Sequence, residues 1–259
     1  MFMKNNNVHL VMHGGLGNQF FQYFKFSLIC QRNNSNILYI HEEFLQKYNT
    51  PRYCEILNFI MLNEGKNFLI SNPCLITNLR IPKVIYKIFN KEYVLRIPFF
   101  GCILDGYFQK PSNFLIGDKD LINATLTKWI KILSNTGLIS KKDHDSVCHL
   151  RLGDFFDNPS SALLYARERL ESFREVIHIA TDEEAIVANA IKLTANPKNY
   201  VLLPTSTLDS WGVFSLLTKY RVIHTNGSTL AFWASILSES KLNTTNDDHM
   251  SIFNYLTTK

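Results

Sequence analysis

Short apolar runs alternate with longer stretches of helical spacing along most of the chain, and turn-forming residues separate them. At the start, the pattern predicts a strand over 8–12, a helix from Asn18 to Ile29 and a second strand over 36–40. The glycines within 14–17 interrupt the pattern between the first strand and the helix. A strand, a glycine turn, a helix and a strand in this order are typical of a parallel βαβ unit.

The middle of the chain is less regular. A helix is expected over 51–62, but 63–100 contains only short apolar pieces interrupted by prolines, and the pattern does not order it. A strand is expected over 102–104, and a helix over 113–133, where apolar residues recur at helical spacing. The polar stretch 134–145 is the best candidate for a linker.

The last part of the chain alternates regularly between the two patterns. Strand patterns that are each followed by a helix pattern predict a parallel sheet with helices on both faces. The expected strands are 147–152, 176–180, 200–203 and 222–224, and the expected helices are 160–171, 182–193, 208–219 and 228–238. We therefore expect an α/β protein with two Rossmann-like domains, residues 1–140 and 141–259, facing a central cleft.

Composition limits the classes of function. Apolar residues make up 46% of the chain and charged residues 19%, as in globular proteins with a large core. No apolar run reaches the ~18 residues of a membrane span, and the polar start does not resemble a signal peptide. The five cysteines include no CxxC pair, which favours reduced thiols in a cytoplasmic protein over a zinc or redox site.

The net charge of +5 is mild, and the lysines and arginines are dispersed. This distribution fits an anionic small ligand or peripheral contact with an anionic membrane surface, and an ordinary solvated surface explains it equally well. A protein that binds nucleic acid would normally carry a denser basic patch, so no nucleic-acid partner is expected.

The turn after the first strand carries the first candidate ligand-binding residues. Gly15 and Gly17 allow the backbone to approach a ligand closely, and the start of the helix offers unpaired N–H groups. The amide of Asn18 could hydrogen-bond sugar hydroxyls. A purely structural tight turn is the alternative.

The glycine turn is also compatible with a dinucleotide-binding site. Glu42 and Glu43 follow the next predicted strand, where an acid that binds the ribose would lie. Phe20, however, stands where the dinucleotide fingerprint requires its third glycine, which weakens this interpretation without excluding it.

The predicted strand 147–152 carries two candidate donors. Side chains alternate along a strand, so His149 and Arg151 are expected to share a face. Arginine is the preferred bidentate partner of phosphate, and ligands of open α/β sheets bind at the carboxyl ends of the strands. An ion pair between Arg151 and Asp154 would explain the arginine equally well.

Two further strand ends in the same half carry polar residues. Asp182 follows the strand 176–180, where a carboxylate can accept the N–H groups of a guanine or cap the next helix. Ser228 and Thr229 precede a predicted helix and would form an anion-binding nest or a plain N-cap. With Arg151, these residues would supply a cation, a base-binding acid and a phosphate nest.

Four stretches resemble the motifs of the α-1,2-fucosyltransferase family (glycosyltransferase family 11), in the family's order. Residues 14–23 (GGLGNQFFQY) are similar to its N-terminal signature, and residues 104–109 (LDGYFQ) to its central Gly-Tyr-aromatic-Gln motif. Residues 149–155 (HLRLGDF) resemble its His-x-Arg-Arg-Gly-Asp-Tyr motif, and residues 228–234 (STLAFWA) its Ser-Thr-Phe-Ser-Trp-Trp-Ala motif. The matches cover nearly the whole chain.

The resemblance implies a GT-B-like fold and an inverting transfer of L-fucose from GDP-β-L-fucose to the 2-hydroxyl of a galactoside. It implies no cofactor and no essential metal, since GDP-fucose is itself the donor substrate. The partners would be GDP-fucose and a galactose-containing glycan, such as an O-antigen unit. Such an enzyme would work in the cytoplasm, peripherally at the inner face of a bacterial membrane.

The resemblance also assigns roles to the residues already named. Asn18, with Gly15 and Gly17, would face the fucose and the acceptor. On the donor side, the resemblance implies Arg151 at the diphosphate, Asp182 and His149 at the guanosine, and Ser228 and Thr229 at the phosphates.

The resemblance does not identify the residue that accepts the proton of the acceptor hydroxyl. Asp154 is the first candidate because the motif places it at the cleft, and a role in fixing the loop is the alternative; His13 and Asp105 are weaker candidates. The chain also departs from the family, since Leu152 replaces the second arginine of the motif and Phe232 replaces a tryptophan.

Three other functions remain as alternatives. The nearest is a fucosyltransferase of other linkage, α-1,3 or α-1,6. A dinucleotide-dependent oxidoreductase would use the N-terminal turn and bind NAD(H) without binding GDP. A non-catalytic binding module would keep affinity for GDP and neither transfer nor hydrolyse the sugar.

Overall fold

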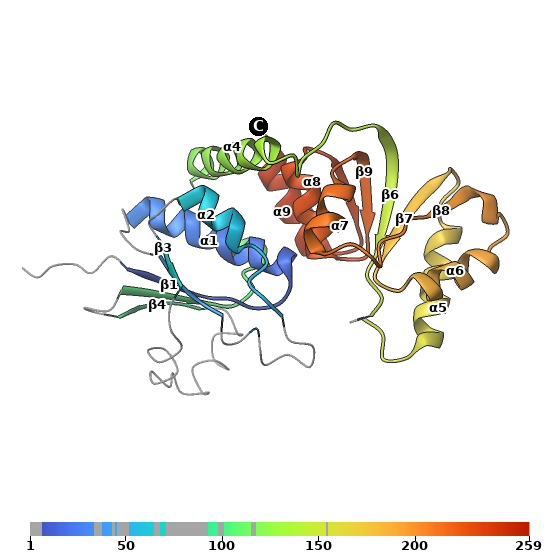
Figure 1. The fold of residues 1–259 in the computed structure, drawn as a ribbon, viewed down its shortest axis with the longest axis horizontal. Helices are drawn as coiled ribbons and strands as arrows, with labels where there is room; N and C mark the ends of the chain where they lie inside the picture. The colour runs from blue at the N-terminus through green and yellow to red at the C-terminus, as the bar shows by residue number, and fades with distance from the viewer. Residues whose placement is uncertain are drawn as a thin grey trace, which may run out of the picture. The chain divides into compact units, whose positions relative to one another are not determined.

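The computed structural model describes residues 7–33, 38–42, 45, 52–64, 68–70, 93–97, 101–114, 118–153 and 155–258. The chain divides into two compact units, Met1–Ile132 and Leu133–Lys259. The secondary structure of both units is α/β, and each unit contains a five-stranded sheet (Figure 1).

The sheet of the first unit has the order β3-β2-β1-β5-β4. All neighbouring pairs are parallel except the pair formed by β4 and β5. The strands are β1 (Val8–Val11), β2 (Leu38–His41), β3 (Phe68–Ile70), β4 (Tyr93–Ile97) and β5 (Gly101–Asp105). The predicted βαβ unit is confirmed, because α1 (Leu16–Asn33) connects the parallel strands β1 and β2.

The first helix begins two residues earlier than the sequence pattern predicts. The carbonyl of Gly15 accepts the backbone N–H groups of Asn18 and Gln19, so Leu16 and Gly17 already belong to the first turn. Gly14 has a φ of +67°, a conformation that favours glycine, and a Cβ atom there would collide with the Asn18 side chain. The break in the pattern therefore lies at Gly14 and Gly15.

Aromatic packing holds the helices of the first unit together. The Trp129 ring on α4 (Lys119–Asn135) stacks on Tyr23 of α1, with 5.1 Å between the centroids. Phe59 on α2 (Leu57–Glu64) meets the same tryptophan edge-on at 5.0 Å. These rings are fully or almost fully buried, and α1 and α2 lie on the same face of the sheet (Figure 1).

The middle of the chain differs most from the predicted pattern. The helix expected over 51–62 begins only at Leu57, and the helix expected over 113–133 begins at Lys119. Two short strands, β3 and β4, lie in the stretch 63–100 for which no order was predicted. Residues 71–92 of that stretch lie outside the described part of the chain.

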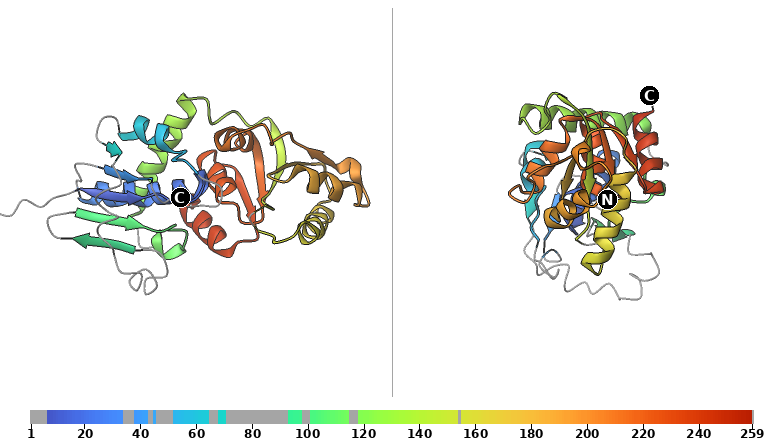
Figure 2. Two further views of the ribbon diagram at one scale, coloured as in Figure 1. Left: turned by 60° about the horizontal axis from the view of Figure 1, so that its bottom comes forward. Right: turned by 90° about the vertical axis from the view of Figure 1, so that its right-hand side faces the viewer.

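The second unit contains an entirely parallel sheet of order β10-β9-β6-β7-β8. The strands are β6 (His144–Leu150), β7 (Ile177–Thr181), β8 (Tyr200–Leu202), β9 (Tyr220–Thr225) and β10 (Lys241–Thr244). The helices are α5 (Pro159–Glu171), α6 (Glu184–Lys192), α7 (Ser210–Leu217), α8 (Thr229–Leu237) and α9 (Asp247–Thr257). Helices α5 and α6 lie on one side of these strands, and α7, α8 and α9 on the other (Figures 1 and 2).

The strand–helix alternation predicted for this unit is confirmed, with two differences. The first strand runs over His144–Leu150 and ends before Arg151, so Arg151 lies on the loop rather than on a strand beside His149. The chain also continues past the last predicted helix into β10 and α9, which the pattern did not reveal.

Candidate functional site

The loops that follow β6, β7 and β9 meet at one edge of the second sheet. From β6 the chain passes to β7 and β8 on one side and then to β9 and β10 on the other. The order of the strands therefore reverses between β6 and β9. In open parallel sheets, ligands bind outside the carboxyl ends of the strands at such a topological switch point.

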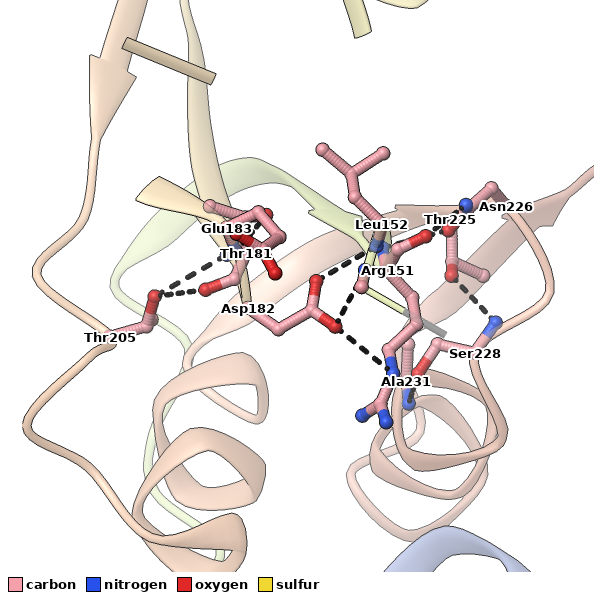
Figure 3. Close-up of polar contacts among 11 residues, drawn as sticks. Arg151, Leu152, Thr181, Asp182, Glu183, Thr205, Thr225, Asn226, Ser228 and Ala231 are labelled. Atoms are coloured by element: carbon pink, nitrogen blue, oxygen red, sulfur yellow. Dashed lines mark hydrogen bonds and ion pairs between the residues drawn. The ribbon is translucent and has the colours of Figure 1, made fainter. Parts of the chain in front are cut away.

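The carboxylate of Asp182 joins the loop after β6 to the end of β7. Its Oδ1 accepts the backbone N–H of Leu152 at 2.8 Å, and its Oδ2 accepts that of Gly153 at 3.2 Å. The same Oδ2 forms an ion pair with Nε of Arg151, also at 3.2 Å. Figure 3 shows the carboxylate between the loop backbone and the arginine side chain. Asp182 therefore fixes Arg151 through both its side chain and the loop that carries it.

Asn226 fixes the other side of the same loop. Its Oδ1 accepts the backbone N–H of Arg151 at 3.0 Å, and its Nδ2 donates to the Arg151 carbonyl at 2.7 Å (Figure 3). This reciprocal pair joins the end of β6 to the loop after β9 across the switch point. The sequence alone does not reveal this role of Asn226, because an Asn-Gly pair predicts a turn but not which backbone groups its side chain will bind.

Ser228 is the N-cap of α8, so the plain capping role weighed from the sequence is present. Its side chain accepts the backbone N–H of Ala231, while its own N–H donates to Oγ1 of Thr225. Gly227, with a φ of +103°, turns the chain into this cap. Thr229 is the first helical residue, and the N–H groups of this first turn carry the positive end of the helix dipole.

His149 is buried at the carboxyl end of β6, with 5% of its surface exposed. Burial lowers its pKa to about 4; the Asp182 charge opposes this shift and the Arg151 charge reinforces it. The imidazole is therefore neutral near pH 7. Its Nδ1 is buried and has no hydrogen-bond partner among the described residues, and the neutral ring cannot serve as a phosphate-binding cation.

Leu152 occupies a core position. It is 1% exposed and belongs to the apolar cluster beneath α5 and α6. The family motif has a second arginine at this place, and here the backbone directs the side chain into the core rather than toward the loop edge.

The N-terminal turn forms a second polar cluster, in the first unit. Oδ1 of Asn18 accepts from Nε2 of Gln109 at 2.8 Å, which joins α1 to the stretch after β5. Gly15 approaches Arg52 so closely that a Cβ atom there would lie 3.0 Å from a guanidinium nitrogen. Gly17 lies within the helix and not in the turn itself.

The residues on which the dinucleotide interpretation depends do not form a dinucleotide site among the described residues. Phe20 is fully buried in the aromatic core, where its ring centroid lies 5.7 Å from that of Phe59. Burial raises the pKa of the Cys54 thiol, and the charge of Glu42 and then its hydrogen bond raise it further. Glu43 lies outside the described residues, as does the candidate base Asp154.

Two features are absent from the described residues. They contain no group of three or more His, Cys, Asp or Glu side chains arranged to hold a metal ion. Within the same residues, no helix has the length and apolar character needed to cross a membrane.

Leu152→Arg is expected to destabilise the protein strongly, because it places an unpaired cation in the core, which typically costs about 3–5 kcal/mol. Leu152→Met keeps a similar volume and is expected to cost less than about 1.5 kcal/mol. Chemical denaturation of both variants measures the difference. An arginine variant as stable as the methionine variant would show that the position tolerates the family's second cation.

Acidification is expected to destabilise the protein through His149. Its folded pKa of about 4 lies below the unfolded value near 6.5, so the unfolded chain binds the proton more readily between these values. The stability contributed above pH 6.5 is lost as the pH falls toward 4, by about 1.4 kcal/mol per pH unit. Denaturation at pH 7 and pH 5 should show a smaller loss for His149→Gln than for the unmodified protein, with exposed His144→Gln as the matched control.

The comparisons with known proteins leave the chain without an assigned family. No protein-family model matches it, and no curated protein matches it. The resemblance to fucosyltransferase motifs thus rests on the four short stretches themselves. The structure adds their location: 14–23 and 104–109 adjoin strands β1 and β5, whereas 149–155 and 228–234 adjoin β6 and β9.

Proposed function

We propose that the protein is an inverting, metal-independent fucosyltransferase of GT-B-like architecture. It transfers L-fucose from GDP-β-L-fucose to the 2-hydroxyl of a galactoside. One observation carries the proposal: Arg151, Asp182, Asn226 and the start of α8 come together at the switch point of the second sheet.

The diphosphate of the donor is assigned to Arg151 and the first turn of α8. The arginine side chain is about one-third exposed, so a ligand can reach it, and Asp182 and Asn226 restrain its loop. The start of α8, at Ser228 and Thr229, adds N–H groups and a dipole end that favours anions. Such preorganised donors stabilise the charge that develops on the leaving diphosphate.

The guanosine of the donor is assigned to His149 and Asp182. The neutral imidazole suits an uncharged base. Asp182 already accepts two backbone N–H groups and pairs with Arg151, which occupies most of the roughly four lone-pair sites of a carboxylate. Its main task in this proposal is therefore to hold Arg151, and its contact with the base is secondary.

The sugar side is assigned to the first unit. Asn18, held by Gln109, would bind hydroxyl groups next to the close backbone approach at Gly15. In a reaction with so good a leaving group, holding the acceptor in line with the anomeric carbon can supply about 7–11 kcal/mol in favourable cases.

The acceptor is proposed to be a galactose-containing surface glycan, modified on the cytoplasmic side of a bacterial membrane. The mild positive charge of +5 suits peripheral contact with an anionic bilayer. Product analysis with a panel of galactosides decides between the 1,2-linkage and the α-1,3 or α-1,6 alternatives. Binding of NAD(H) in place of GDP would favour the oxidoreductase alternative.

Arg151→Ala is expected to abolish transfer while the protein stays folded, because the diphosphate loses its cation. Arg151→Lys keeps the charge but loses the bidentate fork, so it should retain only a small part of the activity. Arg167→Ala removes an exposed arginine paired with Glu171 on α5 and is the matched control. Release of GDP and fucosylated product measures each variant, and an active Arg151→Ala protein would refute the diphosphate assignment.

Removal of divalent metal is expected to leave transfer unchanged, since the proposed charge stabilisation comes from Arg151 and α8. Rates are compared before and after treatment with EDTA, and again after Mg²⁺ or Mn²⁺ is restored. A rate that disappears with EDTA and returns with either metal would contradict a metal-independent mechanism.

A further inference from the structure

A buried histidine–carboxylate pair lies in the first unit, apart from the residues assigned to the donor. Nε2 of His13 lies 2.6 Å from Oδ1 of Asp105, although the two residues are 92 positions apart in the sequence. The residues are 8% and 5% exposed, respectively. Contact this close between buried groups from distant segments requires the fold to position both side chains.

The pair lies at the topological switch point of the first sheet. Strand β1 lies between β2 and β5, and the chain passes to β2 and β3 before it returns to β5 on the other side. Asp105 is the last residue of β5, and His13 follows β1 by two residues. Since β1 and β5 are parallel, both groups lie at carboxyl ends, where ligands of open sheets bind.

Neighbouring contacts fix the histidine backbone. Gln22 of α1 accepts the His13 backbone N–H with its side-chain oxygen and donates its amide to the His13 carbonyl, both at 3.0 Å. The Tyr107 ring lies against the imidazole, with 5.8 Å between the ring centroids. The Asn18–Gln109 hydrogen bond joins the helix after β1 to the stretch after β5. The histidine is thus held in one orientation beside the residues assigned to the sugar.

The chemistry available to His13 depends on the hydrogen bond between its Nε2 and Oδ1 of Asp105. A carboxylate accepts hydrogen bonds, so Nε2 of the imidazole is the donor in this contact and Nδ1 is the other ring nitrogen, on the far side from Asp105. A carboxylate in this position orients the ring and stabilises the imidazolium that forms when Nδ1 takes up a proton.

We propose that His13 is the proton acceptor of the transfer reaction and that Asp105 is its positioning residue. The proposal rests on the proposed fucosyltransferase activity and names the group that activates the acceptor sugar. This proposal assigns to His13 the role of proton acceptor, for which Asp154 was the first candidate from the sequence.

The transfer exchanges one bond to the anomeric carbon of fucose for another. The acceptor hydroxyl oxygen forms a bond to the anomeric carbon of fucose, while the bond from that carbon to the diphosphate oxygen breaks. The electron pair of the broken bond leaves with the diphosphate of GDP. The hydroxyl proton passes to Nδ1 of His13, Asp105 stabilises the resulting imidazolium, and the proton leaves to water after the product departs.

The test compares three variants of the full chain, with steady-state transfer and GDP binding measured for each. His13→Gln is expected to lower kcat by about 10²–10⁴-fold, the usual contribution of a general base, with GDP affinity unchanged. Asp105→Asn should also lower kcat and leave GDP affinity unchanged. His9→Gln changes a different buried histidine, which lies on β1 and contacts His41, and should leave kcat unchanged.

Chemical rescue with added imidazole distinguishes a chemical role of the His13–Asp105 pair from a purely structural one. His13→Ala removes the imidazole, and added imidazole should restore part of the transfer rate, whereas a variant that had only lost its fold would not respond. Thermal unfolding of each variant confirms that the protein is folded during the assay.

The outcomes separate this proposal from the function on which it rests. If the unmodified protein neither binds GDP nor consumes GDP-fucose, the proposed function fails. If it transfers fucose and His13→Gln does so equally fast, the proton-acceptor assignment fails while the function stands. Loss of kcat in Asp154→Asn together with a fully active His13→Gln would return the role to Asp154.

Discussion

The arrangement of the candidate site at the second sheet depends on the contacts of the Asp182 carboxylate. This carboxylate accepts two backbone N–H groups from the loop after β6 and pairs with Arg151, which the same loop carries. An ion pair about one-third exposed contributes only about 0–1 kcal/mol, whereas hydrogen bonds to a charged group contribute about 1.5–3 kcal/mol each. The carboxylate therefore acts mainly on the backbone, and the position of Arg151 follows from the position of its loop.

The two units place polar groups by the same topological rule. In the first sheet the reversal lies between β1 and β5, and it brings His13 to Asp105. In the second sheet it lies between β6 and β9, and it brings Arg151 to Asn226. Each pair joins segments that are far apart in the sequence, because parallel strands need long crossovers. Each unit thus offers a separately built site at its own sheet edge.

The sequence predicted the alternation of the second unit well, because buried parallel strands appear as short apolar runs between amphipathic helices. It misplaced the end of β6 because Leu152 extends the apolar pattern, although this residue returns to the core from a loop. It missed β10, whose polar composition hides a strand. His13 and Asp105 were each weaker candidates for the proton acceptor from the sequence, but their contact could not be predicted, since no local pattern encodes a pairing across 92 positions.

The positive charge of the loop after β6 is concentrated on one side chain. His149 is neutral near pH 7 because burial lowers its pKa to about 4, and Leu152 places a core residue where the family motif has a second cation. The helix dipole at the start of α8 supplies about half a positive charge, which cannot replace a full cation. Within the stretch 149–153, Arg151 is the one residue charged near pH 7, and Asp182 and Asn226 both act to hold its loop. A loop with one cation gains more from a fixed geometry than a loop with two, because no second charge can compensate when the first is displaced.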